Sequence, residues 1–573
     1  MFKTLLLLLL AATGLNAQQT LFRKVFHSDS DTHVEAVALF SSPSLGGFMP
    51  VRVVVANNQK IPHRIYLDFE NRTSHSDGLS TSSTFNFFAP PGKTVTQDIL
   101  VPLAPQNGSH DYQSFKVSLG GSMGSDSDSL ESIFSKDQPA VLLSESLYTV
   151  NGSALNTEQS SRTTSYRGGS NQEFAASFSP KQLPDDWRAF SGYDTIMLSS
   201  DDWSEVPPGP RNAIFSWLRL GGQLVIFTKG SSSVKMLGLP EDTSFGQIIL
   251  RSISNDLRMN EIATVNIPNS ERSAKPRAQA ATSDFIANWP IQEAFGEKSF
   301  RYIYFVIILI AFGILVAPVN LFVFAKSGQR HRLFITTPLI SLGTSLVLVV
   351  LIILQDGFGG DGTRIVLMEV RPDDNQNAAF LHQEQFSRTG VITSPGFTLD
   401  ASALITPVPI DQSRWARLTN AYDSNGAYNL QPSGGKLFAK GEWFQSRSEQ
   451  GQVISAVVPT RGRIEATKSD ALVSTFDFTI DTLLYLSQDG AWFRADNITK
   501  GKPVDLTEID PTMALPLINE TAKKFSERNK SFLNNVRDRQ DHFIALTSSA
   551  PAIETHTGID WDTQTVITGP IAR

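Results

Sequence analysis

The chain has no cysteine among its 573 residues. Disulfide bonds, thiolate metal sites and cysteine nucleophiles are therefore all excluded. Positive charge is also limited, because 49 Lys and Arg stand against 56 Asp and Glu and leave a formal net charge of −7. This balance argues against nucleic acid or an anionic membrane surface as the main partner. No spacing of residues indicates a cofactor or a metal site, so we expect neither.

Two long apolar runs without a formal charge lie in the middle of the chain, and we predict transmembrane helices over residues 301–325 and 333–354. At about 1.5 Å per residue, each run reaches roughly 33–36 Å, enough to cross a hydrocarbon core of about 30 Å. The loop at 326–332 is too short for anything but an antiparallel hairpin. It contains Lys326, Arg330 and Arg332, and such basic loops favour the cytoplasmic side. The lipid bilayer is thus one predicted partner, and both long flanks of the hairpin lie outside the cytoplasm.

Residues 1–17 have the features of a secretory signal peptide. A basic start at Lys3 precedes the apolar stretch Leu5–Leu10, and a cleavage site of small residues ends at Ala17. An uncleaved anchor is the alternative, and it leaves the orientation unchanged. Because an exported chain without cysteine is more typical of bacteria, we expect a bacterial inner-membrane protein with both large regions extracytoplasmic.

Residues 18–119 alternate between apolar and polar side chains. The period of two is clearest at 33–40, 49–55, 64–69 and 95–103. Clusters of Gly, Pro, Asn and Ser separate these segments. Short regular strands with polar turns predict an antiparallel β-sandwich. The stretch 120–138, rich in Gly, Ser and Asp, is predicted to be a linker.

The pattern changes in the region 139–265. Predicted strands cover 139–144, 193–199 and 223–228, and an amphipathic helix covers 211–220. Gly221 and Gly222 end the helix directly before the last strand. A strand, a helix and a second strand in this order form a βαβ unit, which predicts an α/β domain with a parallel sheet.

Several of these residues resemble a known family. They are Leu183–Trp187, Gly192–Asp194 and Trp217–Gly222 before a strand. The pattern resembles a class I glutamine amidotransferase-like (flavodoxin-like) domain, as found in bacterial membrane proteins of unassigned function, over roughly residues 139–250. In the enzymes, a nucleophilic cysteine ends the strand after the double glycine, whereas Thr228 occupies that place here. The domain also contains no histidine, so the resemblance implies a non-catalytic domain.

Asp201 and Asp202 follow the carboxyl end of a predicted parallel strand, where open α/β sheets bind their ligands. Together with Thr228 they are the candidate ligand-binding residues. Paired carboxylates at such an edge bind cations or exchange protons, which makes an exported hydrolase the alternative function. The other interpretation of the two carboxylates is helix capping.

The segment 266–300 is expected to approach the membrane, with Trp289 and Phe295 in an interfacial aromatic belt. Within the hairpin, Pro318 is expected to kink the first helix. Asn320 lies at a depth similar to Thr336 and Thr337, and a hydrogen bond from Asn320 to one of them is expected. Ser341 extends a small-residue face that favours close packing. The alternative role of these polar groups is a site in a transport path.

The region 355–573 is rich in predicted strands, and Asn519–Phe543 is its one long helical candidate. We expect a second β-sandwich-like module with one helix packed on it. The predicted fold class is therefore a multidomain α+β membrane protein with a β-sandwich, a parallel-sheet α/β domain, a two-helix hairpin and a β-rich C-terminal domain. The predicted function is extracytoplasmic binding or scaffolding of a protein partner in the cell envelope. A transporter subunit is a further possibility.

Overall fold

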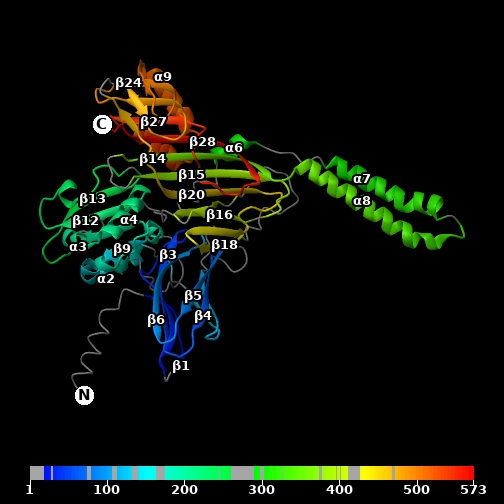
Figure 1. Cartoon of the computed structure of the whole chain (residues 1–573), viewed down its shortest axis with the longest axis horizontal. Helices are drawn as coiled ribbons and strands as arrows, with labels where there is room; N and C mark the ends of the chain where they lie inside the picture. Colours follow the sequence, from blue (N-terminus) through cyan, green and yellow to red (C-terminus); the bar gives the residue numbers. More distant parts are fainter. Residues whose placement is uncertain are drawn as a thin grey trace.

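The structure is a computed structural model of the chain, shown in Figure 1. It describes residues 19–27, 30–73, 79–105, 113–131, 134, 140–162, 175–243, 245–259, 289–296, 302–325, 327–372, 377–394, 396–400, 402–408, 410, 426–467 and 471–572. These residues form an N-terminal pair of β-sheets, an α/β region, a large C-terminal sheet and a projecting helical hairpin (Figure 1). The predicted signal peptide lies outside the described residues.

Two sheets pack face to face in the N-terminal region. One has the order β1-β2-β3-β6 and contains β1 (Gln19–His27), β2 (Thr32–Ala38), β3 (Phe48–Asn57) and β6 (Lys93–Pro102). The other includes β4 (His63–Arg72), β5 (Leu79–Ala89), β7 (Ser114–Gly121) and β8 (Asp126–Glu131). Side chains from both sheets, among them Val53, Leu67 and Val117, form one buried core. β8 falls within the segment predicted as a linker, because its exposed Ser and Asp side chains at the sheet edge have the composition of a loop.

Three strands from beyond the hairpin complete the second of these sheets. They are β16 (Phe397–Asp400), β18 (Gly426–Ser433) and β19 (Lys436–Gly441). β18 runs parallel to the first half of β5, with Gly426 opposite Leu79 and Asn429 opposite Ser82. The N-terminal region therefore shares a continuous hydrogen-bonded sheet with residues beyond the hairpin.

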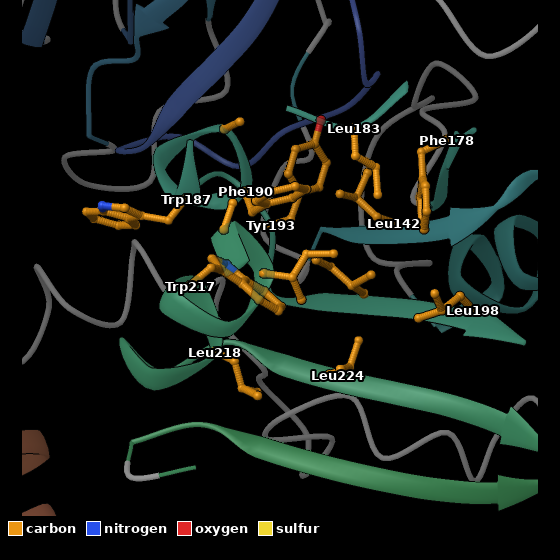
Figure 2. Packing of buried hydrophobic residues seen from close by; sticks show 14 of the residues in the cluster. Leu142, Phe178, Leu183, Trp187, Phe190, Tyr193, Leu198, Trp217, Leu218 and Leu224 are labelled. Carbon is orange, nitrogen blue, oxygen red and sulfur yellow. The ribbon is translucent and has the colours of Figure 1, made fainter. Parts of the chain in front are cut away.

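The α/β region contains a five-stranded parallel sheet with the order β10-β9-β11-β12-β13. Its strands are β9 (Val141–Ser144), β10 (Ala175–Phe178), β11 (Thr195–Ser199), β12 (Gln223–Thr228) and β13 (Gln247–Ser252), and its helices include α2 (Glu145–Arg162), α3 (Ser200–Glu205) and α4 (Pro208–Arg219). In chain order this is 2-1-3-4-5, the order of flavodoxin-like sheets. The predicted parallel sheet is confirmed, and Figure 2 shows Phe190, Tyr193 and Trp217 gathered on the face that α4 covers.

The C-terminal region is built on a nine-stranded mixed sheet with the order β17-β20-β15-β14-β28-β27-β23-β24-β26. Its strands are β14 (Gly360–Val370), β15 (Ala378–Thr389), β17 (Ala403–Val408), β20 (Glu449–Pro459), β23 (Ile480–Leu486), β24 (Trp492–Ile498), β26 (Thr507–Ile509), β27 (His542–Thr547) and β28 (Ile559–Pro570). Helices α9 (Pro511–Ala522) and α10 (Glu527–Arg537) bury Ile518 and Phe532 against one face. A small sheet of β21 (Ile464–Ala466), β22 (Leu472–Ser474) and β25 (Pro503–Val504) covers part of the other face.

This architecture corrects the expectation of a second β-sandwich with one helix. The helix predicted over Asn519–Phe543 is two helices, because α9 ends at Ala522 and Ser526 is the N-terminal cap residue of α10. The last part of the predicted span is the start of β27 instead. The high charge of this segment hid the break between the helices, since it weakens any apolar periodicity.

The hairpin consists of α7 (Ile303–Ile314), the π-helix η6 (Leu315–Phe324) and α8 (Leu333–Asp356). Its two limbs are long and apolar enough to cross a membrane, and almost none of their side chains is buried. The hairpin projects away from the nine-stranded sheet (Figure 1). Pro318 lies inside the π-helical part, where the missing backbone N–H interrupts the regular α-helical ladder.

Candidate functional site

The parallel sheet reverses its strand order between β9 and β11, and ligands of open α/β sheets bind at this position beyond the carboxyl ends of the strands. β9 ends at Ser144 and β11 ends at Ser199. Helix α3 follows β11 directly and carries Asp201 and Asp202 in its first turn. The structure therefore places both predicted carboxylates at the reversal point, beside two serines that sequence reasoning did not select.

Asp202 is held by hydroxyl groups from three serines. Ser144 Oγ and Ser199 Oγ each donate to Asp202 Oδ2 at 2.7 Å, and Ser146 Oγ donates to the same oxygen. Asp202 N in turn donates to Ser199 Oγ at 3.1 Å, which completes a capping box at the start of α3. The carboxylate thus fastens the ends of β9 and β11 to each other and to α3.

The other two candidates are also engaged in local contacts. Asp201 is exposed and forms an ion pair with Lys229, with 2.7 Å between Lys229 Nζ and Asp201 Oδ2. Thr228 is buried at the end of β12, and its hydroxyl donates to the carbonyl oxygen of Gly230 at 2.8 Å. A hydroxyl group needs an adjacent base to act as a nucleophile. The hydrogen bonds of Thr228 join it to backbone carbonyl groups, which are not bases.

In the hairpin, the expected hydrogen bonds between the helices are present. Asn320 Nδ2 donates to Thr337 Oγ1 at 2.9 Å, and Thr336 Oγ1 donates to Asn320 Oδ1 at 2.6 Å. Asn320 is fully buried between the limbs. Ser341 lies one helical turn or more beyond this contact on α8. The amide of Asn320 is therefore satisfied by the partner helix, which suits an element that packs in an apolar medium.

Buried charges join the hairpin to the nine-stranded sheet, and sequence reasoning missed them. Glu384 on β15 is fully buried and accepts hydrogen bonds from Trp289 Nε1 at 3.0 Å, from Ser526 Oγ at 2.6 Å and from Asn529 Nδ2 at 2.6 Å. Burial raises the pKa of Glu384, although these donors act in the opposite direction. Arg388, four residues along β15, donates to the carbonyl oxygen of Gly296 at 2.7 Å.

These contacts correct the expectation that Trp289 belongs to an interfacial aromatic belt. Its side chain is only 1% exposed and packs in the core between the sheet and α9–α10. Phe295 is partly buried, with its ring 5.4 Å from that of Phe386. On the far side of the hairpin, Asp356 at the end of α8 forms an ion pair with Arg447. The segment before the hairpin therefore contacts the nine-stranded sheet, and the end of α8 contacts the turn that leads into β20.

A second set of charges joins the α/β region to the nine-stranded sheet. Asp242, between β12 and β13, pairs with Arg371 Nη2 at 2.6 Å and with Arg539 Nη1 at 2.9 Å. Beside it, the rings of Phe245 and Phe532 stack with centroids 3.6 Å apart. The junction between the α/β region and the large sheet thus combines ion pairs of Asp242 with the stacked rings of Phe245 and Phe532. Contacts at more than one point hold the two regions in one relative orientation.

A cleft of about 790 Å³ lies where three parts of the molecule meet. Its walls come from β3, β5 and β6, from residues 183–188 of the α/β region and from the turn 432–437 between β18 and β19. The sandwich is joined to the α/β region by hydrogen bonds from Tyr193 Oη to the Ser41 carbonyl and to Ser191 Oγ from the backbone N of Phe48, which also lines the cleft. The cleft lies outside the predicted crevice, and it is within the size range of small-molecule and peptide sites.

The chain matches no protein-family model, and it matches none of the curated proteins. Among solved structures, the sporulation control protein Spo0M from Bacillus subtilis is similar over 18% of this chain and 47% of its own, at 17% identity and a TM-score of 0.14. The chain thus spans about half the length of that structure. A β-glucuronidase from Bacteroides uniformis is similar over 41% of this chain and 37% of its own, at 9% identity and a TM-score of 0.19.

The μ-homology domain of yeast δ-COP, solved with a peptide, is similar over 37% of this chain and 95% of its own, at 9% identity and a TM-score of 0.16. All three likenesses are distant, and none assigns the chain to a family. The functional argument therefore depends on the geometry of the chain itself.

Proposed function

We propose that this chain is a membrane-anchored binding or scaffold protein whose large regions lie outside the cytoplasm, and whose α/β domain is non-catalytic. The observation that carries this proposal is the set of hydrogen bonds that the Asp202 carboxylate accepts. This carboxylate accepts three serine hydroxyls and the start of its own helix, and so serves to hold the strand ends together. A general acid or base must instead face the substrate.

The remaining features agree with this proposal. The similarity to amidotransferase-like domains implies a cysteine where Thr228 stands, and the hydroxyl of Thr228 bonds to backbone carbonyls. The hairpin is apolar and exposed, as a membrane anchor in the bacterial inner membrane requires. Glu384 and Arg388 of the nine-stranded sheet bind the segment before the hairpin, and Arg447, just before β20, pairs with Asp356 at the end of α8. A partner bound outside would thereby be held at a fixed distance from the bilayer.

Purification from solubilised membranes after chemical cross-linking tests this function. We expect a protein of the cell envelope to co-purify with the full chain. The same yield is expected from a variant with Asp201→Asn, Asp202→Asn and Thr228→Val, which removes the charges and the hydroxyl at nearly constant shape. If this variant keeps the partner but loses a phenotype of the gene, the exported hydrolase is the better function.

The orientation needs its own measurement. Two reporters are fused in turn after the last residue, Arg573, one that is active only after export and one that is active only in the cytosol. Activity outside the cytoplasm is the expected result, whereas activity only in the cytosol would overturn the extracytoplasmic role.

A further inference from the structure

The sandwich has an unpaired strand edge at β5. β18 pairs with β5 from Leu79 to Ser82, and in the described part of the chain no strand continues the pairing on this side. β18 then turns into the hairpin with β19, and Pro432 near its end has no N–H to donate. The second half of β5 is thus left open where β18 departs from it.

The hydrogen-bonding direction of this edge follows from the register. Thr73 N donates to the carbonyl of Leu79, so the backbone groups of Leu79 face β4. The N–H and C=O of one residue point to the same side of a strand, and successive residues alternate. The backbone groups of Thr84, Asn86 and Phe88 therefore face away from β4, toward the open side.

The edge of the other sheet opens on the same side. β6 is the last strand of its sheet and pairs only with β3 among the described strands. Leu103 N donates to the carbonyl of Gly47, so alternation turns the backbone groups of Asp98 and Leu100 outward. Thr84, Asn86, Asp98 and Leu100 all line the cleft of about 790 Å³. An exposed strand edge is a template for a further strand, and here two such edges face one cavity.

The cleft also carries two exposed charges of opposite sign. Asp185 lines it from the α/β region and Lys436 from the start of β19. Neither forms an ion pair with another residue of the described ranges. A ligand that carries both a cation and an anion along its length would complement them.

We propose that the cleft binds an extended peptide segment of a partner protein, which adds to β5 as a further strand and continues the pairing that β18 begins. The backbone of the segment pairs with Thr84, Asn86 and Phe88, a basic side chain meets Asp185 and an acidic side chain meets Lys436. This mode of recognition takes its affinity from main-chain hydrogen bonds and its specificity from side chains. The inference rests on the proposed binding function and identifies the surface that performs it.

The probe is a displayed library of random peptides of about ten residues, roughly twice the usual strand length, panned on the detergent-solubilised full chain. A selected peptide is then synthesised with N-methyl groups on alternate residues. Methylation of the amides that face β5 is expected to weaken binding by tenfold or more, and methylation of the other set is expected to have little effect. Hydrogen exchange at the amides of Thr84, Asn86 and Phe88 should slow when the peptide binds.

Charge variants locate the site. Lys436→Glu is expected to weaken the selected peptide severalfold, and the matched variant Lys440→Glu, on the same strand but outside the cleft, is expected to leave binding unchanged. Equal effects of both methylation sets, or no effect of Lys436→Glu, would overturn the strand addition. A dimer of the free protein that Lys436→Glu dissociates would show a second copy as the occupant, and would also overturn it. If an envelope partner still co-purifies in these cases, the proposed function stands without this surface.

Discussion

The indole of Trp289 donates a hydrogen bond to the buried carboxylate of Glu384 at 3.0 Å, across 95 positions of the chain. Trp289 precedes the first limb of the hairpin, and Glu384 lies in the middle of the nine-stranded sheet. The same carboxylate accepts the hydroxyl of Ser526 at the start of α10. Arg528 on that helix donates to the carbonyl of Leu220 in the α/β region at 3.2 Å. One side chain thus links the base of the hairpin, through α10, to the α/β domain.

Removing this carboxylate should destabilise the C-terminal region. Glu384→Ala leaves Trp289, Ser526 and Asn529 without their acceptor in a site closed to water. We expect a loss of about 3 kcal/mol in the free energy of unfolding. Chemical denaturation measures it, with the exposed Glu520→Ala on α9 as the control that leaves the curve in place. Equal curves for both variants would show that water replaces the lost acceptor.

Glu384 also predicts a pH dependence. Burial raises its pKa in the folded protein, so the folded state holds this proton at pH values where the unfolded state has released it. The associated stability is present below the usual glutamate pKa of about 4.3 and is lost as the pH rises through the raised value. Denaturation of the Glu384→Gln variant at a series of pH values should show a flatter decline in this window than the wild-type chain. A parallel decline in both would assign the slope to other groups.

Asp202 should contribute to stability through its serine partners. Asp202→Ala removes the acceptor of Ser144, Ser146 and Ser199, and we expect a loss of about 1–2 kcal/mol in thermal unfolding. Its neighbour supplies the matched control, because Asp201→Ala breaks only an exposed ion pair with Lys229. If Asp201→Ala lowers the thermal stability more than Asp202→Ala does, the three serine hydrogen bonds are not the main contribution of this crevice to stability.

The contact at Asn320 should hold the hairpin together. Asn320→Leu removes hydrogen bonds to Thr336 and Thr337, and we expect a cost of about 1 kcal/mol in detergent or lipid. Thermal unfolding followed by the helical signal measures it. Thr344→Val is the control, since the Thr344 hydroxyl donates within its own helix to the Ile340 carbonyl. An unchanged midpoint for Asn320→Leu would count against this pairing.

Asp242 should fasten the α/β region to the large sheet. Asp242→Ala leaves Arg371 and Arg539 without a shared partner, and we expect faster hydrogen exchange in β12, β13 and α10 with a loss of about 2 kcal/mol. The exposed pair of Asp477 and Lys500 offers the control variant Asp477→Ala. If hydrogen exchange becomes faster only in the mutated loop, the stacked rings of Phe245 and Phe532 are sufficient to hold the two regions together.

Local patterns in the sequence predicted the features that depend on neighbouring residues. These features are the two apolar runs, the helix before Gly221 and the strand after it. Each follows from the pattern of apolar residues within one short segment. Helix α2 was missed because its Ser-, Asn- and Thr-rich sequence has little amphipathic pattern. The break before Ser526 was missed because the segment is highly charged and because Glu384, which accepts the Ser526 hydroxyl, lies on a distant strand.

The features that escaped prediction are pairings between distant segments. No periodicity in β5 shows that β18 will lie beside it, because alternation specifies the face of a strand and not its neighbour. A tryptophan close to an apolar run is typical of a membrane interface. Only the hydrogen bond from Trp289 to the buried Glu384 shows that its side chain lies in the protein core instead. At the candidate site, the positions of Asp201 and Asp202 followed from the strand end, whereas the bond from Ser144 to Asp202 depends on the pairing of β9 with β11 in the parallel sheet.

The pairing of β18 with β5 bears on how the protein is made. Ser80 donates to the carbonyl of Gly426, a contact that spans 346 positions. Ribosomes deliver a chain from its first residue, so the early strands remain incompletely paired while the apolar hairpin is synthesised. Their final partner arrives only afterwards, and truncation before it would leave the earliest domain unfinished. The N-terminal sandwich is therefore complete only after β18 has been synthesised, and the first residues of β5 lack their partner strand throughout that delay.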